Sequence, residues 1–227
     1  MTFPRALAAV IFDLDGVLTD TAVAHFRAWK KLADELGVPF DAAANESLKG
    51  VDRMGSLDFI LRRGGLDLSE DERRVLAARK NVSYQSEIAG FSPAELFPGA
   101  AAALAAIRAA GLRTGLASSS QNAPFLLDRL GIAGSFDYVA DARLIRRSKP
   151  DPEIFLTVAA QLSVPPALCL GVEDAAAGIV AIKTSGMSAL GIGEAAALPR
   201  ADAVIPHIAD FHLADYLAGA SEEKGSE

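Results

Sequence analysis

Short apolar runs alternate with helical patterns along most of the chain, and this alternation restricts the fold more than any other feature. Six runs have the character of buried strands, at residues 7–12, 113–117, 138–140, 168–172, 189–192 and 203–205. Helical patterns separate them at 100–110, 123–130, 152–162 and 175–185, and Gly111, Gly131 and Gly186 follow helical patterns as C-terminal caps would. The order predicts an α/β fold, a Rossmann-like parallel sheet with helices on both faces.

One region, from Thr19 to about Gly90, contains no good strand pattern. Helical patterns occupy it instead, at 22–36, 42–48, 52–63 and 69–87, and a Gly-Val-Pro segment at 37–39 ends the first. We expect an inserted helical cap over the carboxyl edge of the sheet. The predicted domains are an α/β catalytic core of residues 1–18 and 92–227 and a helical cap of residues 19–91. The predicted hinges are 17–20 and 89–93.

Composition limits the partners and the compartment. The 227 residues carry a net charge of −7, so the surface as a whole should repel nucleic acid and anionic membranes. No apolar run approaches the ~20 residues of a membrane span, and the N-terminal segment lacks the pattern of a signal peptide. Cys169 is the one cysteine and cannot form an internal disulfide, which favours a reducing compartment. We therefore expect a cytoplasmic protein that binds neither nucleic acid nor membrane, and a monomer.

Polar side chains follow four of the predicted strands. Asp13 and Asp15 come directly after the first strand, where desolvating a charge is costly. A Ser-Ser-Ser-Gln-Asn segment at 118–122 follows the second strand, the basic segment 146–150 comes after the third, and Glu173-Asp174 follows the fourth. Ligands of open α/β sheets bind beyond the carboxyl ends of the strands. We therefore expect all four segments to meet at one edge of the sheet.

These groups suit phosphoryl transfer. Carboxylates from two strands, Asp13 with Glu173 and Asp174, form an all-oxygen site for Mg²⁺. Such a metal keeps an anionic nucleophile from being repelled by an anionic phosphate. Ser118 and the N–H groups that follow it can hold phosphate oxygens at a helix N-terminus. Lys149 adds a positive charge beside the transferred group.

The nucleophile that the sequence offers is a carboxylate. No histidine, cysteine or serine–base pair is placed to attack phosphorus, whereas an aspartyl-phosphate intermediate is a known use of aspartate. Asp13 can attack while Asp15, two residues on and on the same side, exchanges a proton with the leaving or entering oxygen.

Each fragment alone also has a purely structural interpretation. Asp-x-Asp is common in turns, serine-rich segments are usually loops, and Glu173-Asp174 could simply favour a helix dipole. The basic residues at 146–149 could be a solvated run. Their joint position, each in order after a strand, favours the catalytic interpretation.

With these motifs the chain resembles the haloacid dehalogenase superfamily over nearly its whole length. The resemblance is carried by Asp13-Leu14-Asp15-Gly16, Ser118, Lys149-Pro150, and Gly171-Val172-Glu173-Asp174 with Gly178. It implies Asp13 as nucleophile and Asp15 as general acid and base. It also implies Mg²⁺ held by the Asp13 carboxylate, the Asp15 backbone carbonyl and Asp174, with Glu173 alongside.

The cap resembles that of the β-phosphoglucomutase family. The matching segments are Asp20-Thr21-Ala22, His25-Phe26-Arg27-Ala28-Trp29, Leu48-Lys49-Gly50-Val51, Arg53 with Ser56, and Arg79-Lys80-Asn81, together with Leu116-Ala117-Ser118, Asn122 and Pro124-Phe125-Leu126-Leu127 in the core. That family interconverts β-D-glucose 1-phosphate and D-glucose 6-phosphate through β-glucose 1,6-bisphosphate. The phosphate- and substrate-binding residues that the resemblance implies are Gly16, Thr21, His25, Trp29, Lys49, Gly50, Val51, Arg53, Ser56, Lys80, Ser118, Ser119, Ser120, Asn122 and Lys149.

Basic and hydroxyl residues of the cap suit a second phosphate site. A mutase must bind one phosphate at Asp13 and another at a distance, and Lys49, Arg53 and Ser56 follow helical spacing. Arginine is suited to bidentate phosphate binding. A lid that excludes water would let the bisphosphate rotate end for end without losing its phosphoryl group to water.

Three other cap residues keep two interpretations. His25 lies four residues before Trp29, so it either packs on that ring or contacts the active site. Thr21 is a helix N-cap, a site residue, or both. Lys80 is either a surface lysine or a site residue, and the resemblance favours the site.

Four positions depart from the family pattern. Gln121 stands where a lysine is expected, and Ala175 replaces a hydroxyl residue after Glu173-Asp174. Ser119 fills a site that is usually small and apolar, and Met54-Gly55 is also unlike the pattern. These differences bear on phosphate affinity more than on reaction type.

Two rival functions follow from the same residues. A sugar-phosphate phosphatase would use Asp13 and Asp15 in the same way, with water as the acceptor, so the cap residues Lys49-Gly50 and Arg53 are what favour a mutase. A non-catalytic sugar-phosphate-binding module would be expected to lack Asp13 or Lys149, and both are present.

Overall fold

The computed structural model describes residues 6–48 and 50–217. Within these residues, six parallel strands form a sheet in the order β3-β2-β1-β4-β5-β6. Their bounds are β1 Ala9–Phe12, β2 Arg113–Leu116, β3 Tyr138–Val139, β4 Cys169–Glu173, β5 Ser188–Ile192 and β6 Ala203–Ile205. The prediction of a parallel α/β sheet is confirmed, and each strand ends within two residues of its predicted bounds.

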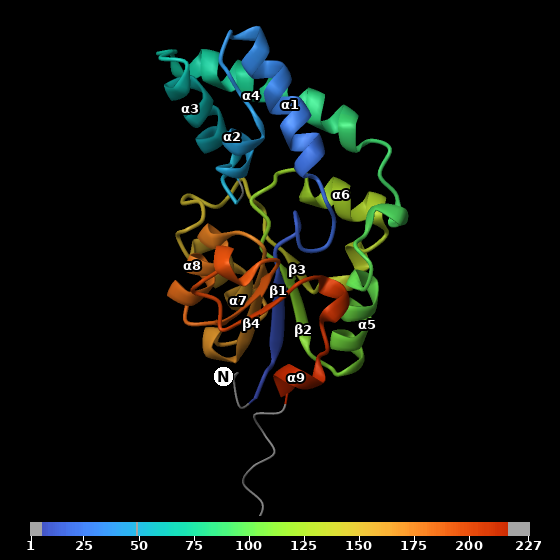
Figure 1. Cartoon of the computed structure of the whole chain (residues 1–227). Helices are drawn as coiled ribbons and strands as arrows, with labels where there is room; N and C mark the ends of the chain where they lie inside the picture. Colours follow the sequence, from blue (N-terminus) through green and yellow to red (C-terminus); the bar gives the residue numbers. More distant parts are fainter. Residues whose placement is uncertain (1–5, 49, 218–227) are drawn as a thin grey trace, which may run out of the picture.

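Helices pack on both faces of this sheet, with α7 and α8 on one side and α5 on the other (Figure 1). The helices after the second strand are α5 Ala100–Ala109, α6 Ala123–Leu130, α7 Glu153–Gln161, α8 Ala176–Thr184 and α9 Ala214–Leu217. Short 3-10 helices are η1 Pro93–Glu95, η2 Ala133–Ser135, η3 Pro166–Leu168, η4 Ala195–Ala197 and η5 Ile208–Asp210. Gly111, Gly131 and Gly186 have φ of 73°, 71° and 86° and end α5, α6 and α8 as predicted.

The central strand β1 divides its side chains between two hydrophobic clusters. Val10 and Phe12 belong to the cluster that includes α5 and α6, whereas Ala9 and Ile11 belong to the cluster that includes α7 and α8. All four are completely buried. Burial on both faces explains why the run is continuously apolar. It also places Asp13, the next residue, between the ends of β2 and β4.

Four helices lie beyond the carboxyl end of β1 (Figure 1). These cap helices are α1 Ala22–Glu35, α2 Ala42–Glu46, α3 Arg53–Arg63 and α4 Glu70–Ile88. They enclose a hydrophobic cluster of their own, built around Trp29, Leu57 and Ile60. Side-chain oxygens of Asp41, Asp52 and Ser69 accept hydrogen bonds from the first turns of α2, α3 and α4. The predicted helical insertion is therefore observed, with ends that differ by at most two residues.

Two segments join the cap helices to the sheet, and they are hydrogen-bonded to each other. The Phe97 N–H donates to the Leu18 carbonyl at 2.9 Å, and Thr19 Oγ1 donates to the Glu95 carbonyl at 2.7 Å. Leu18 and Thr19 lie within the first predicted hinge, whereas Glu95 and Phe97 lie two and four residues after the second. The exact domain boundaries, after residues 18 and 91, stay a prediction. None of the helices in the described ranges is both long and apolar enough to cross a lipid bilayer.

Candidate active site

The side chains that follow β1 and β4 meet at the carboxyl edge of the sheet. Asp13 follows β1, Glu173 is the last residue of β4 and Asp174 comes next. Lys149, far from both in sequence, donates hydrogen bonds from Nζ to Asp13 Oδ1 at 2.6 Å and to Glu173 Oε2 at 2.7 Å. The fold therefore brings together four of the residues that the sequence placed at this edge.

Lys149 is buried, and its positive charge is stabilised by its two carboxylate partners. Burial alone would lower the pKa of Lys149, but the charges of Asp13 and Glu173 outweigh it and raise the pKa above the ordinary value. The ammonium also lies 5.1 Å from the centroid of the Phe155 ring. Lys149 is thus held charged beside Asp13, where it can stabilise negative charge on a transferred group.

Three carboxylates at this edge fit a divalent cation. Asp13, Glu173 and Asp174 each offer one oxygen, and these oxygens lie within 4.8 Å of one another. Burial, with the charges of Asp13 and Asp174, raises the pKa of Glu173 above its ordinary value despite the nearby Lys149. A bound cation would offset that repulsion, and an all-oxygen donor set suits a hard divalent ion.

Two glycines leave space for these carboxylates. A Cβ atom at Gly16 would lie 2.2 Å from Asp174 Oδ2, and one at Gly178 would lie 2.0 Å from Glu173 Oε2. Gly16 also has a φ of 82°, which side chains rarely adopt. The glycines of the two sequence motifs therefore have a steric role at the site.

Asp15 lies beside Asp13 and is set up to exchange protons. Burial raises the pKa of Asp15 to about 7, with a further contribution from the Asp13 charge. The Thr21 hydroxyl donates a hydrogen bond to Asp15 Oδ1, and this bond lowers the pKa of Asp15, against the effect of burial. A carboxyl group with a pKa near 7 can donate and accept a proton near neutral pH. Thr21 stands at the N-cap of α1 but makes no side-chain capping bond, so its hydroxyl serves the site.

The loop after β2 presents hydroxyl and amide groups to the same edge. Ser118 Oγ accepts from the Ser120 N–H at 3.1 Å, and Ser120 Oγ accepts from the Asn122 N–H at 3.2 Å. Asn122 is the N-cap residue of α6, yet its side chain does not cap that helix. Its Nδ2 instead donates to Asn81 Oδ1 of α4 at 2.9 Å, which links this loop to the cap.

The cap contributes a buried cation held by aromatic rings. Lys80 Nζ lies 3.0 Å from His25 Nδ1, 4.5 Å from the centroid of the Trp29 ring and 4.7 Å from that of Tyr84. Burial, followed by the Arg53 charge, lowers the pKa of Lys80 to about 7. Burial and the Lys80 charge hold the pKa of His25 well below its ordinary value, so His25 is neutral and accepts from Lys80.

These contacts decide between the interpretations of the cap residues. Lys80 is only 4% exposed and is not a surface lysine. The His25 ring contacts Tyr84, at 4.1 Å between centroids, and lines a cavity between the cap helices and the sheet. Arg53 Nη2 donates to Asn81 Oδ1 at 2.9 Å, and burial lowers the pKa of Arg53.

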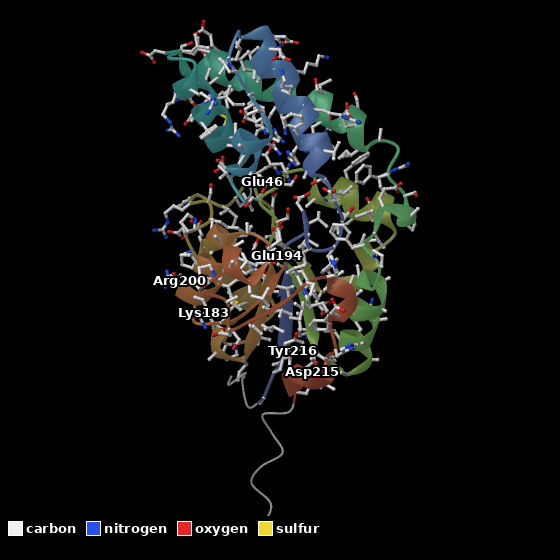
Figure 2. The ribbon with its side chains drawn as sticks, viewed as in Figure 1. Glu46, Lys183, Glu194, Arg200, Asp215 and Tyr216 are labelled. Carbon is white, nitrogen blue, oxygen red and sulfur yellow. The ribbon has the colours of Figure 1, made fainter. Side chains whose placement is uncertain are left out.

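A cavity of about 900 Å³ lies between the cap helices and the sheet. The predicted site residues that line it are Asp13, Asp15, Gly16, Thr21, His25, Trp29, Gly50, Val51, Arg53, Ser56, Lys80, Ser119, Ser120, Asn122 and Asp174. Ser118, Lys149 and Glu173 do not line it, and all three are buried. Lys49 lies outside the described residues. The cavity also reaches Glu46 of α2 and Glu194 after β5, which Figure 2 shows on the cap and on the core.

Sequence reasoning did not place several residues at the site. Asn81 accepts from both Arg53 and Asn122, and its signal in the sequence was its place in the matching segment Arg79-Lys80-Asn81. Tyr84 is a buried core residue that does not line the cavity, and its contacts with Lys80 and His25 had no signal in the sequence. Of the departures from the family pattern, Gln121 lines the cavity, and the Ala175 N–H donates to Glu173 Oε1 at 3.1 Å.

The fold and this set of groups are those of a known protein class. The family model of haloacid dehalogenase-like hydrolases matches residues 7–186, and the chain belongs to this family. It is also similar to the β-phosphoglucomutase of Bacillus subtilis strain 168, with 46% identity over 209 residues that cover 91% of this chain and 92% of that protein. These findings confirm the resemblance inferred from the sequence motifs.

Two further relatives extend the comparison. A crystal structure of β-phosphoglucomutase from Clostridium difficile matches with a TM-score of 0.92 and 41% identity, and the match covers 95% of this chain and 98% of that one. Fructose-1-phosphate phosphatase of Escherichia coli K12 is 30% identical over 185 residues, which cover 82% of this chain and 96% of that protein. The family thus includes both mutases and phosphatases.

Proposed function

We propose that the protein is a Mg²⁺-dependent β-phosphoglucomutase that interconverts β-D-glucose 1-phosphate and D-glucose 6-phosphate through β-glucose 1,6-bisphosphate. The observation that supports this proposal is one cavity with two sets of groups that are suited to bind phosphate. Asp13 and the residues around it lie on the core side, and Arg53 and Lys80 lie on the cap side. Similarity to the Bacillus subtilis mutase over 91% of the chain supports the same function.

The first half-reaction transfers a phosphoryl group between the bisphosphate and Asp13. A carboxylate oxygen of Asp13 attacks phosphorus, an oxygen–phosphorus bond forms, and the bond from phosphorus to the sugar oxygen breaks. Asp15 gives its proton to that leaving oxygen. In the second half-reaction a hydroxyl of the bound sugar monophosphate attacks the phosphorus of the aspartyl phosphate. The bond from phosphorus to the Asp13 oxygen breaks, which restores the Asp13 carboxylate, and Asp15 takes the proton of the attacking hydroxyl. The pKa of Asp15, about 7, suits both roles.

Groups around Asp13 stabilise the negative charge of the transferred phosphoryl group. Lys149 is held charged by Asp13 and Glu173. The N–H groups after Ser118 lead into α6, where a helix N-terminus favours anions. The Asp13 and Asp174 carboxylates and the Asp15 carbonyl, with Glu173 alongside, would hold Mg²⁺. When bound, this ion would reduce the repulsion between the Asp13 carboxylate and the phosphate.

The cap residues are suited to the second phosphate and to the exclusion of water. Arg53 and Lys80 supply positive charge, with Ser56 of the same helix as Arg53 also lining the cavity. The volume of about 900 Å³ lies within the ~300–1,000 Å³ that ligand cavities commonly span, so the cavity is large enough for a sugar phosphate. Closure over the aspartyl phosphate favours transfer to sugar over hydrolysis.

A coupled assay tests this proposal. Purified protein is given β-glucose 1-phosphate and catalytic β-glucose 1,6-bisphosphate, and glucose 6-phosphate and free phosphate are measured in the same reaction. Glucose 6-phosphate without stoichiometric free phosphate supports the mutase. Free phosphate as the main product would make the protein a sugar-phosphate phosphatase, the function carried by the name of its Escherichia coli relative.

A cytoplasmic monomer is part of the same proposal. Cys169 is buried, and the net charge of −7 opposes self-association. Among the large exposed apolar side chains of the described residues, Val75 and Val82 share α4, whereas Val23, Phe125 and Leu144 come from separate parts of the chain. Sedimentation velocity in physiological salt should give a single species of about the mass of one chain, 23.7 kDa.

A further inference from the structure

Asp52 uses its two carboxylate oxygens for two different contacts. It is the N-cap residue of α3, and its Oδ1 accepts from the Gly55 N–H at 2.8 Å. Its Oδ2 accepts a hydrogen bond from the Ser148 hydroxyl. The first contact starts a cap helix, whereas the second crosses from the cap to the core. A single carboxylate therefore fixes the start of α3 relative to the loop before α7.

Each end of this contact leads directly to a charged site residue. Arg53, the first residue of α3, lines the cavity on the cap side. Ser148 precedes Lys149, whose Nζ contacts Asp13 and Glu173. The Asp52–Ser148 contact thus connects the proposed distal phosphate site to the proposed transfer site through adjacent backbone positions.

The loop that carries Ser148 is itself anchored to the core. The N–H groups of Arg146 and Arg147 each donate to the Glu153 carboxylate at 3.0 Å, and Glu153 is the first residue of α7. Burial of the Lys149 side chain holds the next residue of the loop. Ser148 is therefore presented from a fixed position rather than from a freely moving loop.

Several other hydrogen bonds between the cap and the core join neutral groups, apart from the bond that the Thr21 hydroxyl at the start of α1 donates to Asp15. Ser119 Oγ donates to the Gly50 carbonyl at 3.3 Å, and Asn122 bonds to Asn81 at 2.9 Å and to Gln85 at 3.1 Å. The Asp52–Ser148 bond has a carboxylate as its acceptor, and hydrogen bonds to carboxylates are roughly twice as strong as those between neutral groups. Both residues are half-buried, which limits screening by water.

We propose that Asp52 is a positioning residue that holds the cap closed against the Lys149 loop. The proposal rests on the proposed mutase function, in which closure protects the aspartyl phosphate from water. Loss of the bond raises the fraction of time that the cap is open. An open cap exposes phosphorylated Asp13 to water, and it also moves Arg53 away from the position that the second phosphate needs.

The test uses variants that remove the contact but keep the helix cap. Asp52→Ser retains a good N-cap for α3 but cannot span to Ser148. Ser148→Ala removes the donor and leaves Asp52 unchanged. Asp41→Ser is the matched control, because Asp41 caps α2 by the same contact, to the Ala44 N–H at 2.8 Å, and has no bond to the core among the described contacts.

Two activity readouts separate positioning from folding. We expect Asp52→Ser and Ser148→Ala each to lower kcat/KM by roughly tenfold, as for one hydrogen bond to a charged group, and to raise the ratio of free phosphate to glucose 6-phosphate. The double variant should lose no more kcat/KM than either single variant, because both substitutions remove the same contact. Asp52→Asn, which can offer its amide to the Ser148 oxygen, should recover part of the loss.

A measurement without turnover keeps this proposal separate from the mutase proposal. Small-angle X-ray scattering should give a larger radius of gyration for Asp52→Ser and Ser148→Ala than for the wild type and Asp41→Ser. This comparison holds whether the wild type proves to be a mutase or a phosphatase. The proposal is overturned if the two variants scatter like Asp41→Ser, or if their effects on kcat/KM multiply in the double variant.

Discussion

Replacement of Lys80 by methionine should stabilise the fold while it removes activity. Lys80 is buried between Trp29 and Tyr84, and burial with the Arg53 charge lowers its pKa from 10.5 to about 7. At about 1.4 kcal/mol for each pKa unit, this shift corresponds to a cost of roughly 5 kcal/mol for keeping the ammonium charged in the fold. Two ring contacts of about 1–2 kcal/mol each are lost in the variant. The net gain should therefore be about 1–3 kcal/mol.

The pH dependence gives this prediction its sign. The pKa of Lys80 is lower in the folded chain than in the unfolded one, so the unfolded state binds more protons between about pH 7 and 10.5. The free energy cost of burying the Lys80 ammonium is at its full value below about pH 7, and it disappears as the pH rises toward 10.5. The difference in the free energy of unfolding between Lys80→Met and the wild type should favour the variant most near pH 6. This difference should be smaller by about 2–3 kcal/mol near pH 9.

Urea denaturation at these two pH values measures the effect, with the free energy of unfolding taken at each. Lys30→Met is the control, because Lys30 is partly exposed on α1 and pairs with Asp34; its variant should show no comparable pH trend. Mutase turnover of Lys80→Met should fall by tenfold or more, since the proposed charge-assisted contact between Lys80 and substrate would be lost. A variant that is less stable than the wild type by the same amount at both pH values would refute this account of Lys80.

Four other perturbations test the site. Asp13→Asn should abolish turnover and phosphoenzyme formation with an unchanged far-ultraviolet circular dichroism spectrum, and residual normal activity would remove Asp13 as the nucleophile. Arg53→Ala should lower kcat/KM for β-glucose 1-phosphate by roughly 10- to 100-fold; unchanged kinetics would argue against the cap phosphate site. Thr21→Val removes a hydrogen bond that lowers the pKa of Asp15, so the acidic limb of the pH–rate profile should move to higher pH, and a fixed profile would contradict that role. Chelation should stop activity and added Mg²⁺ should restore it; activity in thoroughly metal-free protein would exclude the metal site.

The core part of the site could be predicted from the sequence because parallel strands end at a common edge. Asp13 and Glu173 each stand at the end of an apolar run, and the β1–β4 pairing makes these runs neighbours. Lys149 joined them in the prediction through its position after the third strand. Its depth was not predictable, since Lys149, Ser118 and Glu173 are buried outside the cavity lining rather than exposed in it.

The cap side was less predictable, because its residues depend on how helices face the core. Local patterns identified α1 to α4 but not which side of α4 faces the cavity, so Lys80 kept two interpretations until its contacts with Trp29 and Tyr84 were known. The Asp52–Ser148 bond joins residues 96 positions apart and has no local signal. Of the three residues with predicted helical spacing, Arg53 and Ser56 both lie on α3, which begins at Arg53. The third, Lys49, lies outside the described residues.

The location of phosphate on the enzyme tests the central claim most directly. The protein is mixed with β-glucose 1,6-bisphosphate, quenched in acid within the first turnover, digested and analysed by mass spectrometry. Phosphate on the peptide that contains Asp13, absent from Asp13→Asn, is the expected result. Phosphate on any other residue, or product formation with no phosphorylated intermediate, would contradict it.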